Sequence, residues 1–225
     1  MNNTKCCAPA SFSIAFLLIA SVATFASAQD GLKIEKSKPV IEYKHFDPKN
    51  LPDPPPPLGP GEAAVTEYRF EMNTDGRFSF NGPAPEGNPI KLNVKIQSMS
   101  ITLGLKVVIW LPKDCPKILE AHEDGHSKIA QAYYVDAEKV ARALAAKVVG
   151  KEAAGEGKDL QSAGNDAMGK VNQKLLDDYL ETVQSPCQTA QTAFDRITAH
   201  GTNLRPAAKD AVDLAIKEAK EKKTK

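Results

Sequence analysis

The 225-residue sequence lacks a charge excess of either sign, with 29 Lys and Arg residues against 28 Asp and Glu residues. Residues 1–28 contain one charged residue, Lys5, so the remainder of the chain has 28 basic and 28 acidic residues. A nucleic-acid partner or an anionic membrane surface calls for a clustered positive excess. The composition therefore argues against nucleic acid as a partner.

Long apolar runs are also missing, except near the N-terminus. Residues 12–25 form one apolar stretch, which follows Lys5 and ends in the small-residue pattern Ala26-Ser27-Ala28 that is typical of a signal-peptidase site. About fourteen apolar residues are too few to span a bilayer, which requires roughly twenty. We therefore expect residues 1–28 to be a cleaved signal peptide, the protein to be secreted or periplasmic, and no stable membrane insertion after cleavage. An uncleaved membrane anchor is the alternative.

Cysteine is scarce, and two of the four cysteines, Cys6 and Cys7, lie inside the expected signal peptide. Cys115 and Cys187 remain as an even pair in a chain bound for an oxidising compartment, which favours a disulfide between them. Two unpaired buried thiols are the alternative, because a sequence does not show whether two cysteines are close in space.

Proline is concentrated in one segment, since eight of the 16 prolines fall in residues 29–63. Consecutive prolines favour extended polyproline geometry and supply no backbone donors. This segment is therefore expected to be a proline-rich extended arm. Residues 64–222 are expected to form one domain, which is long enough to bury a single core.

The apolar pattern changes its period once within this domain. In residues 64–112 apolar and polar residues alternate, which predicts three or four strands with a turn at 73–76 and a more continuous apolar strand at 101–111. From residue 116 onward the period is 3.6, which predicts helices, with a break at Ser185-Pro186 and a further helix over residues 187–198. The expected fold class is α+β, with a small, largely antiparallel sheet followed by a helical half.

The first predicted helix carries the motif His122-Glu123-Asp124-Gly125-His126 in a chain with only four histidines. Residues four apart share a helix face, so the two imidazoles can bind one Zn²⁺ while Glu123 serves as the base. Glycine inside a helix is unfavourable by about 1 kcal/mol relative to alanine, which favours a site where another group must come close. Two histidines buried in the core are the alternative.

A catalytic zinc needs a third protein ligand. Glu138 lies twelve residues past His126, and His45 lies in the expected arm, whereas His200 precedes Gly201 at the predicted end of a helix. A disulfide between the starts of the two helices would bring His200 level with His126. His200 is therefore the expected third ligand. The alternative is a cationic side chain that stabilises a helix C-terminus.

Two runs of the sequence together resemble a known family. Residues 119–126, Leu-Glu-Ala-His-Glu-Asp-Gly-His, and residues 194–201, Phe-Asp-x-x-Thr-x-His-Gly, resemble motifs of predicted secreted zinc-dependent proteases of bacteria, the domain-of-unknown-function family 922. The resemblance covers roughly residues 64–217 and implies a zincin-like fold with His200 as the third ligand. Phe194 stands where that family usually has tyrosine, which removes a phenolic hydroxyl that could bind or polarise a substrate.

Asp195 and Thr198 belong to the second matched motif and share a helix face. We expect them to orient the rings of His122 or His126, because a carboxylate bonded to a ligand imidazole fixes its tautomer. A surface charge on the helix is the alternative for Asp195. Tyr133 follows His126 by seven residues and could donate to a developing oxyanion, although a core tyrosine is the alternative.

The sequence thus predicts an exported zinc metallopeptidase that acts on a peptide or protein substrate with Glu123 as general base. The strand at 101–111 could supply an edge along which an extended peptide pairs. One alternative is a non-catalytic exported zinc-binding or envelope-interaction protein, which would need the histidines but not Glu123. Another is a hydrolase that acts on a different amide, such as a cell-wall peptide bond.

Overall fold

The structure, a computed structural model, describes residues 31–59, 61–82, 85–202 and 207–223. The signal peptide predicted for residues 1–28, with Cys6 and Cys7, lies outside the described residues. Within the described ranges, no helix is both long and apolar enough to cross a membrane.

The chain has a mixed α/β fold with a five-stranded sheet built around one strand, β4 (Ile90–Pro112). β3 (Val65–Ser79) pairs antiparallel along one edge of β4. Three shorter strands follow one another along the other edge: β5 (Glu152–Gly157) antiparallel, then β1 (Leu32–Lys36) and β2 (Val40–Phe46), both parallel. The prediction of a largely antiparallel sheet is therefore wrong, because two of the four pairings are parallel.

The segment predicted as an extended arm contributes two of these strands. Leu32 and Ile34 of β1 pack against the core, and Lys36 Nζ donates hydrogen bonds of 3.1 and 2.7 Å to the carbonyls of Tyr134 and Val135. Seven of the eight prolines in residues 29–63 follow β2, so they do not interrupt either strand. The predicted arm is thus wrong for residues 32–46, because seven of the eight prolines lie after residue 46 and leave β1 and β2 able to pair with β4.

β3 and β4 are longer than the strands predicted from the alternation of apolar and polar residues. Residues 73–76 form no turn but pair with residues 99–102 of β4, whose length offers partners all along β3. Gln97 of β4 is passed over in the pairing, and this bulge lets both Ile96 and Met99 face the core although they are three residues apart. Residues 101–111, expected to offer an edge, are paired on one side by β3 and on the other by β1 and β2.

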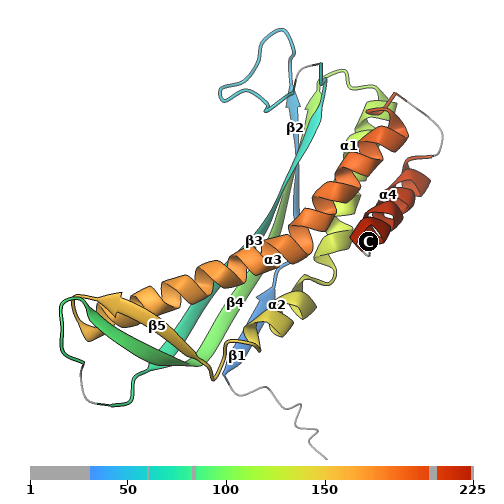
Figure 1. The fold of residues 1–225 in the computed structure, drawn as a ribbon. Coiled ribbons are helices and arrows are strands. Elements are labelled where there is room, and N and C mark those ends of the chain that lie inside the picture. Colours follow the sequence, from blue (N-terminus) through green and yellow to red (C-terminus); the bar gives the residue numbers. More distant parts are fainter. Residues whose placement is uncertain (1–30, 60, 83–84, 203–206, 224–225) are drawn as a thin grey trace, which may run out of the picture.

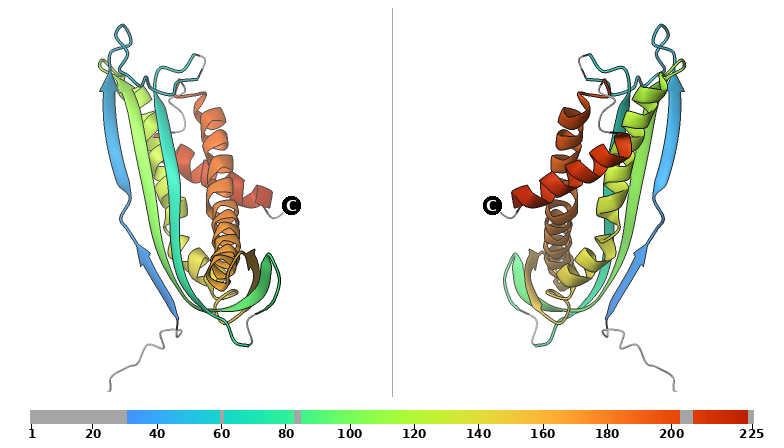
Figure 2. Two further views of the ribbon diagram at one scale, coloured as in Figure 1. Left: turned by 90° about the vertical axis from the view of Figure 1, so that its left-hand side faces the viewer. Right: turned by 90° about the vertical axis from the view of Figure 1, so that its right-hand side faces the viewer.

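Four helices gather on one face of the sheet: α1 (Lys117–Tyr134), α2 (Ala137–Ala145), α3 (Leu160–Thr198) and α4 (Ala208–Lys223) (Figures 1 and 2). The first helical stretch is interrupted at residues 135–136 and resumes as α2. Asp159 caps α3, because its carboxylate accepts from Ser162 N at 2.7 Å and the Ser162 side chain returns a bond to the Asp159 backbone. α4 packs on α3 and α1.

α3 runs through the break that was expected at Ser185-Pro186. Its 39 residues span about 58 Å, so it extends from β5 at one end of the molecule to α1 at the other (Figure 1). An interior proline removes one backbone donor and kinks or breaks many helices. Val183 and Cys187, on either side of Pro186, are both buried, and this packing holds the helix together across the proline.

Cys115 and Cys187 are both free thiols, so the predicted disulfide is wrong. Cys115 precedes α1 and is half-buried, whereas Cys187 lies inside α3 rather than at the start of a helix. Burial raises the pKa of the Cys187 thiol to about 12. An even number of cysteines and an oxidising compartment, on which the prediction rested, do not place two residues together in space. The continuity of α3 also removes the helix start that a Cys115–Cys187 bond was expected to join to the start of α1.

Substitutions at two glycines test how closely β5 packs on α3. Gly155→Ala should destabilise the fold by about 1–3 kcal/mol, because its Cβ would lie 2.0 Å from the carbonyl oxygen of Ala163. Gly169→Ala is the control: it lies on α3 with nothing within 4 Å of a new Cβ and should stabilise the fold by up to about 1 kcal/mol. Urea unfolding of both variants measures the difference, and equal stabilities would contradict the packing.

Candidate metal centre

α1 and α3 approach most closely at Gly125. A Cβ at this position would lie 2.2 Å from Cζ of Phe194, so only glycine leaves room for the ring. The buried Phe194 ring stacks on the His122 ring, with centroids 5.1 Å apart and planes at 13°, and meets His126 edge-on at 5.1 Å. The aromatic residue at 194 therefore positions both imidazoles, and the glycine inside the helix is explained by this close contact.

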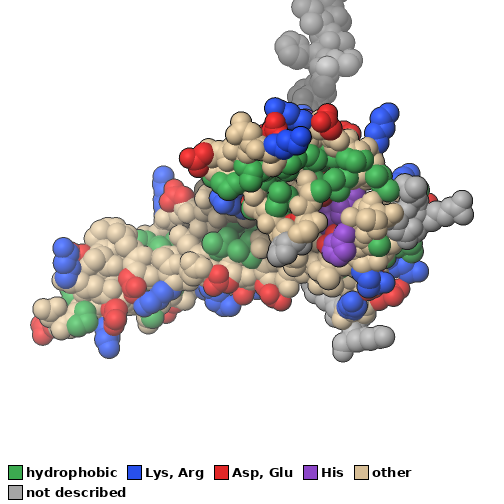
Figure 3. All heavy atoms as spheres, turned by 90° about the horizontal axis from the view of Figure 1, so that it is seen from above, with side chains coloured by type: hydrophobic (Ala, Val, Ile, Leu, Met, Phe, Trp, Pro, Cys, Tyr) green, Lys and Arg blue, Asp and Glu red, His purple; other side chains and the backbone are tan. Residues whose placement is uncertain are grey.

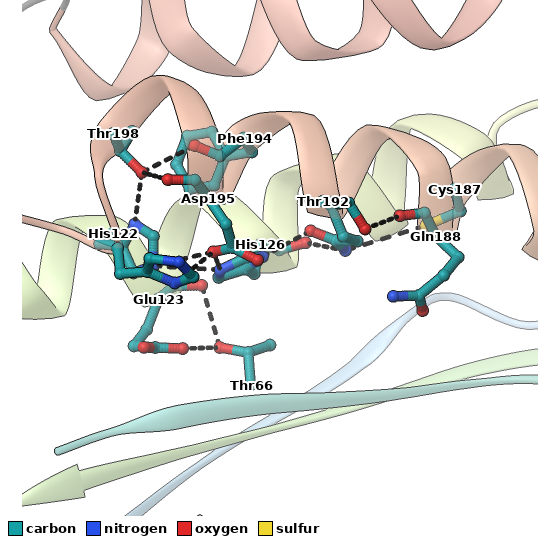
Figure 4. A network of polar contacts seen from close by, with 12 residues as sticks. Thr66, His122, Glu123, His126, Cys187, Gln188, Thr192, Phe194, Asp195 and Thr198 are labelled. Atoms are coloured by element: carbon teal, nitrogen blue, oxygen red, sulfur yellow. Dashed lines mark hydrogen bonds and ion pairs between the residues drawn. The ribbon is translucent and has the colours of Figure 1, made fainter. Parts of the chain in front are cut away.

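Three side chains converge at the point where the two helices meet (Figure 4). His122 Nε2 and His126 Nε2 are 3.2 Å apart, and Asp195 Oδ1 lies 2.9 Å from the latter and 3.4 Å from the former. His122 is 6% exposed and Asp195 is only partly exposed, so the three atoms form a compact group at the floor of a cavity. Among the described residues, His122, His126 and Asp195 form the group that could hold a metal ion.

The size of this triangle suits a tetrahedral ion. Zinc binds imidazole nitrogen and carboxylate oxygen at roughly 2.0–2.2 Å, which places neighbouring ligand atoms about 3.3 Å apart. The three measured separations, 2.9, 3.2 and 3.4 Å, scatter around that value. Two nitrogens and one carboxylate oxygen suit zinc but also other divalent metals, so the donor set fits zinc without being specific to it.

Gln191 fixes the tautomer of His126. The Gln191 amide nitrogen donates to the His126 carbonyl at 3.0 Å, so its oxygen, 2.6 Å from His126 Nδ1, must accept a hydrogen bond from that nitrogen. The proton of a neutral His126 therefore sits on Nδ1, and the lone pair of Nε2 points at the cluster.

Thr198 does the same for His122. Its hydroxyl donates to the Phe194 carbonyl at 2.7 Å, which leaves the oxygen to accept from His122 Nδ1 at 3.1 Å. Both imidazoles thus present a free Nε2 lone pair to one point beside an Asp195 oxygen. Two lone pairs and a carboxylate this close together call for a cation between them.

The pKa values of Asp195 and His126 are each shifted by the other residues of the cluster. Burial by itself would raise the pKa of Asp195, but the hydrogen bonds and positive charge that His122 and His126 supply when their rings are protonated outweigh it and hold that pKa well below its usual range. Burial would likewise lower the pKa of His126, and the Asp195 carboxylate outweighs it and raises that pKa. Asp195 is therefore ionised at neutral pH, as a metal ligand has to be.

Glu123 lies beside this cluster and is held by the sheet. The Thr66 hydroxyl on β3 donates to Glu123 Oε2 at 2.7 Å and lies 3.1 Å from the Glu123 carbonyl oxygen (Figure 4). Glu123 is 3% exposed, and this burial raises the pKa of its carboxyl group although the Thr66 bond opposes the shift. A buried carboxylate with a raised pKa is suited to taking up and releasing a proton.

One cavity of about 810 Å³ is lined by the three residues of the cluster and by Glu123, Thr66 and Gln191. Its walls come from the start of β3 and residues 61–64 before it, from α1, and from the C-terminal half of α3 with residues 200–202. Figure 3 shows histidine side chains at the molecular surface with hydrophobic side chains beside them. The side chains of His126 and Asp195 are 14% and 29% exposed, so the cluster is accessible from outside through this cavity.

The structure does not bring His200 into the cluster. α3 ends at Thr198, and Ala199 and His200 adopt positive φ angles of 46° and 50°, which turn the chain away from the helix. The His200 side chain is 77% exposed, and its Nδ1 lies 3.9 Å from Asp195 Oδ1. Asp195, expected only to orient a ring, occupies the position predicted for His200, because it lies on the α3 face that points at α1.

Two further expectations are resolved by the geometry. Tyr133 is not among the described residues that line the cavity, and its buried hydroxyl has no hydrogen-bond partner in the described part of the chain. The proposed oxyanion donor is therefore wrong, and the core alternative fits. His45 lies on β2 and is exposed, as expected for a residue outside the site.

Gln191 and Thr66 were missed by the sequence reasoning. Gln191 could have been found, because it precedes Asp195 by four residues and Thr198 by seven and so shares their helix face. Thr66 had no such signal, since it reaches Glu123 only through the packing of β3 against α1. Comparison of the chain with family models, curated proteins and solved structures finds no match, so the resemblance stays an expectation carried by two short motifs.

Two substitutions distinguish Asp195 from His200 as the third ligand. Asp195→Asn should weaken zinc binding by more than about 100-fold, because it removes the anionic ligand atom, whereas His200→Ala should stay within about threefold of the wild type. Competition with a chromophoric chelator measures zinc affinity, and circular dichroism checks that each variant is folded. Retained affinity in Asp195→Asn together with loss in His200→Ala would restore the ligand set that the resemblance implies.

Proposed function

We propose that the chain is an exported zinc-dependent peptidase with His122, His126 and Asp195 as metal ligands and Glu123 as general base. The observation that carries this proposal is a buried carboxylate, held by Thr66, in the same cavity as a compact group of two imidazoles and one carboxylate. A site that only stored metal would need the ligand group but would gain nothing from a second, separately anchored carboxylate.

Each residue has a defined task in this proposal. A bound zinc ion supplies Lewis acidity toward a water molecule and toward the substrate carbonyl. Gln191 and Thr198 keep both Nε2 lone pairs directed at the ion, and Phe194 holds the ring planes. Glu123 accepts the proton of the attacking water and transfers it to the leaving amine, while Thr66 holds the carboxylate in place between the two transfers.

An extended peptide is the substrate that fits the cavity best. β4 is paired on both sides, but among the described strands β3 pairs only with β4, so the second edge of β3 is free where Val65 and Thr66 line the cavity. A peptide can add to such an edge through main-chain hydrogen bonds. Ile118 and Leu119 line the same cavity and provide an apolar surface for a substrate side chain. Export is supported by the signal-peptide pattern in residues 1–28.

The proposal is tested with Glu123→Gln in zinc-loaded full-length protein and a mixture of internally quenched peptides. Wild-type hydrolysis should stop on addition of a chelator and return with Zn²⁺. Glu123→Gln should keep its zinc and lose about 10²–10⁴-fold in kcat, because the base is gone while the ligands remain. Glu120→Gln, the same change one turn earlier on the exposed side of α1, serves as control. Full activity in Glu123→Gln, or no hydrolysis by the wild type, would disprove the proposal.

The contact between β3 and Glu123 is tested separately. Thr66→Val should lower kcat about tenfold, as expected for loss of a hydrogen bond to a charged group, with little change in KM or zinc content. Thr66→Ser should recover most of the rate because it restores the hydroxyl. Thr74→Val, on the same strand but outside the described cavity lining, is the matched control. Equal kcat in Thr66→Val and wild type would show that Glu123 does not need this anchor.

A further inference from the structure

The cavity has a side-chain bridge at one end. The Tyr68 hydroxyl on β3 donates to Gln188 Oε1 on α3 at 2.6 Å, and both residues line the cavity. Figure 4 shows Gln188 extending from α3 toward the strands below it. Among the described residues, no residue of β3 after Tyr68 and no residue of α3 before Gln188 lines the cavity. The bridge therefore joins the two walls and closes the groove between them.

The bridge stands close to the proposed reaction centre. Tyr68 is two residues past Thr66 on β3, which is about 6.6 Å in an extended strand. Gln188 is three residues before Gln191 on α3, which is about 4.5 Å along a helix. An extended peptide advances about 3.3 Å per residue, so the space between the centre and the bridge holds about two residues.

The opposite end of the cavity has no side-chain bridge among the described residues. It is lined by residues 61–63 and by His200 and Thr202, all of them exposed and located between regular elements. A peptide in the groove can therefore continue outward on one side of the centre but not on the other.

From this asymmetry we propose that the Tyr68–Gln188 bridge limits the substrate to about two residues on one side of the scissile bond. This inference rests on the proposed peptidase function and narrows its substrate class to peptides cleaved close to one chain end. The residues that determine this specificity, Tyr68 and Gln188, come from the two walls of the groove and belong neither to the group that could hold a metal ion nor to the Thr66–Glu123 pair.

The hydrogen bond of the bridge can be removed while the core packing of the Tyr68 ring is kept. Gln188 is exposed on α3, so shortening it to alanine removes little buried surface and leaves a good helix former in place. Tyr68 is partly buried, and Tyr68→Phe keeps its ring against Phe70, 5.9 Å away, while it removes the hydrogen bond. Both changes open the end of the groove without altering the proposed machinery.

The test uses zinc-loaded full-length protein and unstructured peptides of about twenty residues with mass spectrometry of the products. Wild type should release fragments of one or two residues from a single chain end. It should cleave peptides that have four residues on both sides of the bond at least tenfold more slowly than peptides with two residues on the short side. Gln188→Ala should cleave both peptides at rates within about threefold of each other and yield internal fragments, with Tyr68→Phe intermediate.

Gln184→Ala is the matched control, because it makes the same change one turn earlier on α3 and outside the described lining; it should behave as wild type. Internal cleavage of long peptides by the wild type, with no preference for a chain end, would overturn the proposed role of the bridge while leaving peptidase activity intact. A wild type that hydrolyses no peptide, short or long, would overturn the peptidase proposal and this one with it.

Discussion

The contact between α1 and α3 at Gly125 and Phe194 is the constraint on which the candidate site depends. Glycine lets the two helices approach until the aromatic ring lies against both imidazoles, and this distance brings Asp195 within 2.9–3.4 Å of their Nε2 atoms. A larger residue at 125 would separate the helices, and the three atoms that could bind one ion would no longer lie together. Packing of apolar groups therefore sets the spacing of the polar ones.

Hydrogen bonds from the same two helices complete the arrangement. Gln191, Asp195 and Thr198 form one stripe on α3, and each contacts a histidine of α1. Two of these contacts assign the imidazole protons to Nδ1, so that both lone pairs and the carboxylate face a single point. The group is polar and largely buried, and an ion at that point would satisfy all three atoms together.

The sheet supplies what the helices lack. β3 runs beside the site with one edge unpaired, anchors Glu123 through Thr66, and joins α3 through Tyr68 two residues later. β4 holds β3 in place by pairing with it from Val65 to Ser79. The paired residues include 73–76, for which the sequence predicted a turn. One strand thus forms the cavity wall, supports the proposed base and closes one end of the groove.

The sequence alone determined the features that depend on neighbours along the chain. It predicted helix α1 with His122, Glu123 and His126 on one face, the change from strand to helix period near residue 116, and the motif that contains Asp195 and Thr198. Tertiary structure decided the rest: the strands within the expected arm, the path of α3 through Pro186, the unpaired cysteines, and the presence of Asp195 rather than His200 in the group that could hold a metal ion. These features arise from contacts between residues far apart in the chain. The periodicity of a sequence reflects only neighbouring residues, so it does not predict such contacts.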